Sequence, residues 1–295
     1  MNTKTVLITG CSSGFGLEMV NRFLEFDWTV VATLRNASSR QSIFDEQKKK
    51  YGSRLKVLNL DVTSSDDRAN AVRCVLEEFD GKLDCLVNNA GYGLFGSLED
   101  ISEKQLREQM EVNFFAAALI TRAFLPALRL ARGRIINLSS VFGFSGFPLT
   151  SAYCASKFAV EGLTESLRIE LAPYGIQVSS VEPGGHRTRF SEQVIWGESS
   201  FSESSTYLIP TRGYNSFKAK LSRGANPAKP DAVAKSVVKL AESHRMPARV
   251  VCGKDAILMS FFRHRPLGSR IAESLISLIY RKRFIGGVLS KGKLL

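Results

Sequence analysis

The stretch Thr9-Gly10-Cys11-Ser12-Ser13-Gly14-Phe15-Gly16 follows the β-branched run Thr5–Thr9 and precedes a segment whose apolar residues have helical spacing. A glycine-rich turn between a strand and a helix lets backbone N–H groups come close to a pyrophosphate, which the positive end of the helix dipole attracts. Three glycines could also form a plain tight turn. Their position at the first strand–helix junction favours a dinucleotide site, to which we assign Gly10, Ser12, Ser13, Gly14, Phe15 and Gly16.

The same alternation of strand and helix continues to about residue 180. β-branched, mostly apolar runs occur at Thr5–Thr9, Thr29–Thr33, Leu55–Leu60, Cys85–Asn88, Arg134–Leu138 and Gln177–Val181. Between them apolar residues recur every three or four positions, as in helices. This pattern is typical of a parallel sheet buried on both faces by helices. We therefore predict an α/β, single-domain Rossmann fold with a doubly wound parallel sheet.

The regular pattern ends after Pro183. Residues 190–226 are rich in Ser, Gly, Phe and Tyr, which predicts a substrate lid inserted after the sixth strand. A helix from Pro230 to about His244 and a last strand, Arg249–Cys252, are expected to complete the sheet. We expect residues 1–262 to form one domain and residues 263–295 to form a basic amphipathic extension.

Composition narrows the class of protein. The chain has 295 residues, of which 44% are hydrophobic and 23% charged, which excludes a disordered or fibrous protein. Its uninterrupted apolar stretches are shorter than the roughly 20 residues of a spanning helix, and the N-terminus lacks the pattern of a secretion signal. The 5 cysteines contain no C-x-x-C pair, so we expect reduced thiols, no metal site and a cytoplasmic location.

The net charge of +12 is concentrated in the C-terminal extension. The rest of the chain is nearly balanced, so we expect no nucleic-acid partner. In the extension, apolar residues recur at near-helical spacing between two basic clusters (Ile271, Leu275, Ile276, Leu278 and Ile279). Such a helix can lie on an anionic membrane, or it can pack against the body or a second subunit.

The end of the second strand bears on which dinucleotide binds. NAD sites usually place an acid there, whereas NADP sites omit it and place an arginine nearby. Here Leu34 and Arg35 follow the strand, and no carboxylate is present. Arg35 could be an ordinary surface residue, but with the hydroxyls of Ser12 and Ser13 it favours NADP(H).

Tyr153 and Lys157 stand four residues apart at the start of a helical segment, so they share one face. Tyrosine titrates near pH 10, and a nearby ammonium favours the phenolate and lowers its pKa. The pair alone is common in proteins. It acquires meaning because Ser140 ends a strand thirteen residues earlier, Asn88-Asn89-Ala90-Gly91 ends another, and Asn113 lies within a helix.

Together with Asp61 and with Pro183-Gly184 and Thr188, these motifs resemble the classical short-chain dehydrogenases/reductases (SDRs), over residues 4–190. The resemblance implies that Tyr153 is the general acid/base and that Lys157 lowers its pKa and holds the nicotinamide ribose. Ser140 would orient the substrate oxygen, in competition with Ser139. Asn113 would hold a water of the proton relay, or only cap or kink its helix. The other implied cofactor-binding residues are Asp61 with Val62, Asn89, Ala90, Gly91, Pro183, Gly184, His186 and Thr188.

Two features qualify the resemblance. His186 stands where the family has an aliphatic residue, and its side chain could point to the cofactor or to solvent. Asp61 could alternatively cap the following helix. Thr9–Gly14, Ala32–Arg35 and Tyr153–Gly162 are most similar to the 17β-hydroxysteroid and retinol dehydrogenase branch.

We therefore expect an NADP(H)-dependent oxidoreductase that interconverts a small apolar alcohol and its ketone or aldehyde. The insert offers apolar residues as pocket walls, which could equally be ordinary core: Phe190, Ile195, Trp196, Phe201, Tyr207, Leu208 and Phe217. The resemblance also implies a homodimer or homotetramer through helices near Ser102–Ala131 and Ala152–Pro173. The alternative is a non-catalytic NADP(H)-binding sensor or interaction protein on the same fold.

Overall fold

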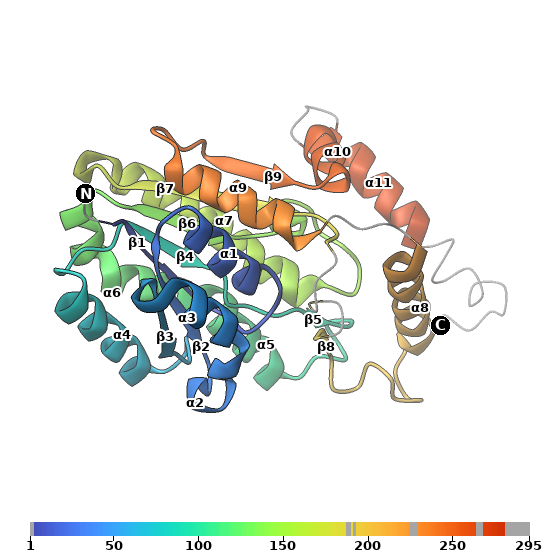
Figure 1. Cartoon of the computed structure of the whole chain (residues 1–295). Helices are drawn as coiled ribbons and strands as arrows, with labels where there is room; N and C mark the ends of the chain where they lie inside the picture. Colours follow the sequence, from blue (N-terminus) through green and yellow to red (C-terminus); the bar gives the residue numbers. More distant parts are fainter. Residues whose placement is uncertain (1–2, 187–189, 191–192, 225–228, 264–267, 281–295) are drawn as a thin grey trace.

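The computed structural model describes residues 3–186, 190, 193–224, 229–263 and 268–280. Its centre is a parallel sheet with helices on both faces (Figure 1), with the strand order β3-β2-β1-β4-β6-β7-β9. The strands of this sheet are β1 (Thr5–Ile8), β2 (Thr29–Leu34), β3 (Leu55–Asn59), β4 (Cys85–Asn88), β6 (Arg134–Leu138), β7 (Gln177–Pro183) and β9 (Arg249–Cys252). The predicted doubly wound α/β fold is confirmed, including the last strand.

Helices connect the strands, and two more follow β9. They are α1 (Gly14–Glu25), α2 (Ala37–Arg40), α3 (Asp45–Tyr51), α4 (Ser65–Glu78), α5 (Glu103–Met110), α6 (Ala116–Ala131), α7 (Ser151–Glu170), α8 (Leu208–Gly224), α9 (Pro230–Glu242), α10 (Lys254–Arg263) and α11 (Gly268–Tyr280). Short 3-10 turns are η1 (Gln41–Phe44), η2 (Gly52–Arg54), η4 (Val141–Gly143) and η5 (Ala172–Tyr174), and η3 (Glu111–Phe115) is a π-helical segment between α5 and α6.

Alternating side chains of the strands divide the core into two layers. On β1, Val6 and Ile8 lie in the cluster packed by α1 and α9, whereas Leu7 lies in the cluster packed by α4 and α6. This alternation follows from the two-residue period of a strand. Fully buried Phe23 of α1 and Phe124 of α6 anchor the two layers. Burying such a side chain contributes about 1.5–3 kcal/mol.

The helical run Glu103–Ala131 is long and apolar enough to cross a membrane by length and composition. Soluble proteins contain core helices that meet the same test. Here the apolar face formed by Ile120, Phe124 and Leu128 is buried against the sheet. Packing in the core therefore accounts for these three residues, whereas Leu130 on the same helix is 64% exposed.

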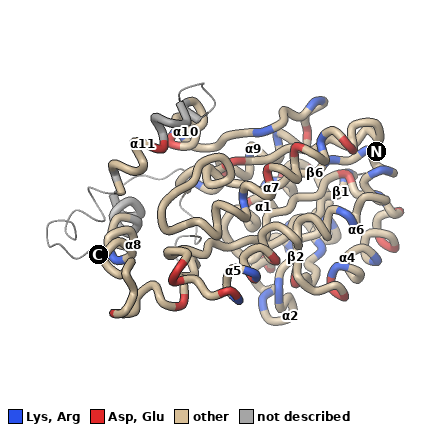
Figure 2. Tube along the Cα trace, turned by 180° about the vertical axis from the view of Figure 1, so that it is seen from behind, with Lys and Arg blue, Asp and Glu red and all other residues tan. Residues whose placement is uncertain are grey.

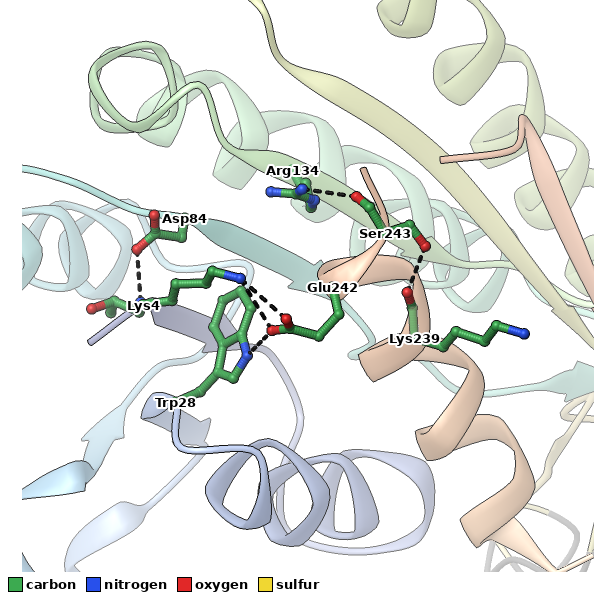
Figure 3. A network of polar contacts seen from close by, with 8 residues as sticks. Lys4, Trp28, Asp84, Arg134, Lys239, Glu242 and Ser243 are labelled. Carbon is green, nitrogen blue, oxygen red and sulfur yellow. Dashed lines mark hydrogen bonds and ion pairs between the residues drawn. The ribbon is translucent and has the colours of Figure 1, made fainter. Parts of the chain in front are cut away.

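The end of the sheet where the strands begin is fastened by a polar network (Figure 3). Glu242, the last residue of α9, accepts hydrogen bonds from Lys4 Nζ at 3.2 Å and from the buried Trp28 Nε1 at 2.5 Å. The next residue, Ser243, accepts a bond from Arg134 through its carbonyl oxygen at 2.9 Å. These contacts join α9 to the starts of several strands, so this end serves stability and leaves the other end for a site.

Basic and acidic residues are interspersed over the body, as Figure 2 shows. At the end of the sheet where the strands finish, α10 and α11 follow β9, and α8 lies beyond β5 and β8 (Figure 1). The strands β5 (Leu94–Phe95) and β8 (Ile195–Trp196) form a separate two-stranded sheet, which the sequence did not predict.

Candidate functional site

The strand order reverses between β1 and β4, which makes the crevice at their carboxyl ends the expected ligand site of such a sheet. Thr9 follows β1, and Asn89 and Ala90 follow β4. The Thr9 hydroxyl accepts the backbone N–H groups of Asn89 and Ala90, each at 2.9 Å. The Asn89 amide donates to the carbonyl oxygens of Thr9 and Gly10, at 2.8 and 3.0 Å. The two predicted cofactor segments therefore form one rigid unit.

The glycine loop leaves no room for a side chain at Gly10 or Gly16. Gly10 has a φ of +72°, and a Cβ on it would lie 2.9 Å from the Ala90 Cα atom. A Cβ on Gly16 would overlap the Gly10 carbonyl group. Helix α1 begins at Gly14, and its N-cap residue, Ser13, makes no side-chain capping bond. A close backbone turn that leads into a helix N-terminus fits the pyrophosphate of a dinucleotide.

A hollow at the carboxyl ends of β2 and β3 lies where the adenosine end of a dinucleotide would extend. It is lined by Arg35, Asn36, Arg40, Asn59, Asp61 and Asp67. Partial burial raises the pKa of Asp61, but hydrogen bonds from Thr63 and the charges of Arg35 and Arg68 outweigh it and hold that pKa below its usual value. The hollow therefore holds two arginines and two aspartates. The sequence analysis missed Arg40, which the fold brings beside Arg35 from α2.

Two details of the adenosine end differ from simple expectations. The cap of α4 is Ser64, whose hydroxyl accepts the Asp67 N–H, so Asp61 does not cap this helix. The Val62 side chain is buried in the core, and its carbonyl oxygen accepts a 2.8 Å hydrogen bond from Arg68. The Leu34 side chain is likewise in the core, only 2% exposed. A test of cofactor choice therefore belongs at the exposed Arg35 rather than at Leu34.

Tyr153, Ser140 and Lys157 come together at the start of α7. The Ser140 hydroxyl hydrogen-bonds the Tyr153 side chain, whereas the buried Ser139 hydroxyl has no partner among the described residues. Lys157 Nζ lies 5.8 Å from the centroid of the Tyr153 ring. Of the two adjacent serines, the geometry brings Ser140 to the tyrosine.

The protonation of this group is dominated by burial. Burial raises the pKa of Tyr153 well above its ordinary value, against the opposing effect of the Ser140 hydrogen bond. Burial also lowers the pKa of Lys157 to about 8, although the charge of Glu161 raises it. Lys157 Nζ donates a 2.7 Å hydrogen bond to the Leu138 carbonyl oxygen at the end of β6. In the free protein, burial therefore outweighs the pKa-lowering effect expected from Lys157.

Asn113 lies in the π-helical segment η3, a distortion that often occurs at functional sites. Its amide nitrogen donates to the Tyr92 carbonyl and to the Ser156 hydroxyl, each at 3.0 Å, and its oxygen accepts the Tyr92 N–H at 3.1 Å. A Cβ on Gly91 would lie 3.0 Å from that oxygen and 3.8 Å from Lys157 Nζ. Asn113 thus holds the loop after β4 against α7, the helix of Tyr153 and Lys157.

The segment after β7 is braced by Asp255 of α10, a residue the sequence analysis missed. Its carboxylate accepts the Gly185 N–H at 2.6 Å, and a Cβ on Gly184 would collide with it. His186 donates from Nδ1 to the Gly184 carbonyl at 3.0 Å, and its ring meets the Phe15 ring edge-on at 5.5 Å. His186 therefore faces the glycine loop rather than solvent. Thr188 lies outside the described residues.

Aromatic rings surround Tyr153. The centroids of Phe142, Phe190 and Phe95 lie 5.4, 5.6 and 6.0 Å from that of Tyr153. Around Phe95 stand Trp196 at 6.0 Å and Tyr214 at 5.9 Å. Phe190 and Trp196 were predicted as walls, whereas Phe95, Phe142 and Tyr214 were not. The rings make the surroundings of the Tyr153 ring apolar.

The insert is anchored to the body by backbone pairing and by one aspartate. Strand β8 pairs in parallel with β5. Asp100 accepts hydrogen bonds from Ser97 and from Ser205, both at 2.7 Å. Residues 191–192 and 225–226 of the predicted lid lie outside the described residues. The anchored part of the insert places aromatic residues beside α7.

Comparison with known proteins agrees with this geometry. The model of the short-chain dehydrogenase family matches residues 4–198. The chain is 36% identical over 254 residues to retinol dehydrogenase 8 of Bos taurus, over 83% of this chain and 80% of that protein. It is 41% identical over 204 residues to estradiol 17-beta-dehydrogenase 1 of Rattus norvegicus, over 67% of this chain and 58% of that protein. The chain belongs to the short-chain dehydrogenase family and is related to its retinol and 17β-hydroxysteroid dehydrogenases.

Solved structures share the whole architecture. A short-chain dehydrogenase from Streptomyces avermitilis superposes with a TM-score of 0.76 and 30% identity, over 99% of this chain and 98% of that one. The structure of ElxO with NADP bound has a TM-score of 0.70 and 26% identity, over 87% of this chain and 99% of that one. The family and the similar proteins identify an oxidoreductase that acts on CH–OH groups.

Proposed function

We propose that the protein is an NADP(H)-dependent oxidoreductase that interconverts an apolar primary or secondary alcohol with its aldehyde or ketone. The observation that carries this proposal is the convergence of Ser140, Tyr153 and Lys157 next to the loop after β4 and to a group of aromatic rings. The NADP-bound structure of ElxO supports the choice of cofactor.

Different residues of the chain would have different roles in such a reaction. The bound dinucleotide would supply or accept the hydride. Tyr153 donates a proton to the carbonyl oxygen during reduction and takes the hydroxyl proton during oxidation. Ser140 orients the substrate oxygen by a hydrogen bond and favours the phenolate. Lys157 holds the ribose next to the nicotinamide and places a positive charge near the tyrosine ring.

The other predicted residues would hold the cofactor along the crevice. The glycine loop and the N-terminus of α1 take the pyrophosphate, and Arg35 takes the phosphate that distinguishes NADP. Asp61 and the backbone of Val62 take the adenine. Pro183, Gly184, His186 and Thr188 follow β7 and would line the nicotinamide end, together with Asn89, Ala90 and Gly91.

A non-catalytic binding role is the second candidate, and one observation favours it. Tyr153 is only 5% exposed, with Phe142 and Phe190 packed close to its ring. A sensor would not need substrate access to this oxygen. For an enzyme, the same covering excludes water from the reacting atoms, provided that the insert moves to admit the substrate.

Cofactor preference is tested at Arg35. Replacing it by alanine removes a charge-assisted hydrogen bond to the additional phosphate, worth about 1.5–3 kcal/mol. We expect Arg35→Ala to raise the dissociation constant of NADPH about 10- to 100-fold and to leave that of NADH nearly unchanged. Fluorescence titration with both dinucleotides measures the effect.

Arg73→Ala serves as the control, because it removes the same charge from an exposed position on α4. Arg40→Ala removes the second arginine that lines the hollow and should also weaken NADPH binding. Equal affinity of the unmodified protein for NADH and NADPH would contradict the proposed preference.

Association and location form a further part of the proposal. Phe115 of η3 and Phe158 of α7 are large apolar residues with 47% and 41% exposure. We assign the α6–α7 surface to a homodimer or homotetramer contact. On α10 and α11, Ile257, Leu258, Phe261, Leu275 and Leu278 are also exposed. With the basic sequence that follows, they support a cytoplasmic enzyme that touches anionic membranes through residues 263–295.

A chain that ends at Arg265 separates these two ideas. We expect full-length and shortened proteins to have the same multimeric mass by light scattering, because the shortened chain keeps α6 and α7. Only the full-length protein should pellet with anionic liposomes at low salt, and high salt should release it. A monomeric full-length protein would refute the first idea, and equal pelleting of both chains would refute the second. Arg281, Lys282, Arg283, Lys291 and Lys293 lie outside the described residues.

A further inference from the structure

Two glutamates are buried against each other one helical turn beyond Lys157. Glu161 of α7 is 8% exposed and Glu182 of β7 is 0% exposed. The Ser180 hydroxyl donates a 2.9 Å hydrogen bond to Glu161 Oε2. Gly143 packs on the other side, where a Cβ would lie 3.2 Å from the Glu161 Cγ atom. The pair is thus enclosed between α7, β7 and η4.

Three oxygens of this pair have no hydrogen-bond donor among the described residues: Glu161 Oε1, Glu182 Oε1 and Glu182 Oε2. Two buried carboxylates side by side would be very costly if both were charged. One proton shared between them gives the missing donor, because a protonated carboxyl can donate to its neighbour. The unsatisfied oxygens therefore indicate one neutral and one charged glutamate.

The surroundings show which glutamate carries the proton. Glu161 receives the Ser180 hydrogen bond, which favours its charged form. Burial and the neighbouring charge of Glu161 raise the pKa of Glu182 to about 7, and the more distant charge of Glu165 acts in the same direction. Arg249 opposes this effect, with its Nε 3.8 Å from Glu182 Oε1, but it also forms an ion pair with Glu165. Cys252 of β9 faces Glu182 as well. The proton belongs on Glu182.

Lys157 is the cation that benefits from the remaining charge. It lies near the Tyr153 ring on its own helix, bonds the Leu138 carbonyl at the end of β6, and lies 3.8 Å from the position of a Cβ on Gly91. None of these groups is an acid. Burial alone favours the neutral amine, and Glu161 is the charged group that raises the pKa of Lys157.

We infer that Glu161 is a positioning residue that keeps Lys157 in its ammonium form, and that Glu182 holds the proton that allows Glu161 to stay charged. This inference rests on the proposed function, in which Lys157 must be charged. It assigns a task to two buried acids that are not among the residues we assign to the substrate or the cofactor.

The direct test is the titration of Lys157 in the free protein, by NMR of lysine labelled with ¹³C at Cε. The Lys157 signal is identified by its loss in Lys157→Arg. In the unmodified protein it should titrate near pH 8, the value to which burial lowers the pKa. Glu161→Gln removes the negative charge, so the ammonium is less favoured and the midpoint should fall by about one pH unit. The alkaline limb of kcat/KM should move to lower pH by a similar amount.

Two controls belong to this test. Glu165→Gln removes a charge one turn further along α7, where the side chain is exposed, and should leave the Lys157 midpoint in place. Glu182→Gln supplies a neutral partner for Glu161, so the Lys157 midpoint should again not fall. Ser180→Ala removes the bond that favours charged Glu161 and should lower the Lys157 midpoint by a smaller amount. It takes the place of Glu161→Gln if that variant does not fold.

The possible outcomes distinguish a failure of this inference from a failure of the proposed function. An unchanged Lys157 midpoint in Glu161→Gln and Ser180→Ala, or an equal fall in Glu165→Gln, would overturn the inference. A fall confined to Glu161→Gln and Ser180→Ala would support it. This holds even if no alcohol or carbonyl compound is turned over, which would count against the proposed function alone.

Discussion

Tyr153→Phe is expected to lower kcat by at least about 10³-fold, because it removes the oxygen that exchanges a proton with the substrate. The rings of Phe95, Phe142 and Phe190 pack around the tyrosine ring, and phenylalanine keeps those contacts. The fold and the cofactor site should therefore remain intact. Steady-state kinetics on a confirmed substrate measure the loss, and NADPH fluorescence titration should show a nearly unchanged dissociation constant.

The adjacent serines provide a matched comparison for the same step. Ser140→Ala removes the hydroxyl that bonds Tyr153 and should lower kcat. Ser139→Ala removes a hydroxyl without a partner among the described residues and should not lower kcat in this way. A Tyr153→Phe enzyme that reduced its substrate at the unmodified rate would refute the proposed mechanism.

Lys157→Met is expected to impair both turnover and cofactor binding. Methionine has nearly the length of lysine but no charge, so the variant loses the hydrogen bond to the Leu138 carbonyl and the positive charge near the Tyr153 ring. We expect kcat to fall about 10²- to 10⁴-fold and NADPH to bind more weakly. Kinetics and fluorescence titration on the same preparation distinguish this double effect from the single effect of Tyr153→Phe.

An exposed lysine shows whether the loss is specific. Lys104→Met removes a charge from α5, where the side chain is 84% exposed, and should change neither quantity. The pH dependence gives a further check. Because the pKa of Lys157 is lowered to about 8, activity that needs the ammonium should be present below pH 8 and decline above it. A Lys157→Met variant that bound NADPH as tightly as the unmodified protein would contradict the role of Lys157 in both turnover and cofactor binding.

Much of the fold could be predicted from local patterns. The β-branched run at Arg134–Leu138 and the run at Cys85–Asn88 are strands with those same bounds, because strands buried on both faces have a strong apolar signature. The run predicted as Gln177–Val181 continues to Pro183. A final proline fits this strand end, since it needs no further ladder hydrogen bond there.

Three of the predicted catalytic residues also meet in space, because Tyr153 and Lys157 share a helix face and Ser140 lies two positions after β6. The residues that the sequence analysis missed act through distant contacts. Asp255 reaches the segment after β7 from 70 positions away, and Phe95 meets Trp196 through a two-residue strand pairing. Neither contact leaves a periodic signal in the sequence. The sequence does not reveal the π-helical segment around Asn113 either, because this segment interrupts a continuous helical pattern by only one wider turn.

The central claim is that this site transfers hydride between NADP(H) and an apolar carbonyl compound. It is tested most directly with NADPH deuterated at the transferred position of C4 and a panel of apolar ketones and aldehydes. Absorbance at 340 nm follows the cofactor, and mass spectrometry follows the product. We predict loss of absorbance matched by an equal amount of alcohol that carries one deuterium at the former carbonyl carbon, with neither change in Tyr153→Phe. Tight NADPH binding without oxidation by any member of the panel would contradict the claim and favour a non-catalytic binding protein.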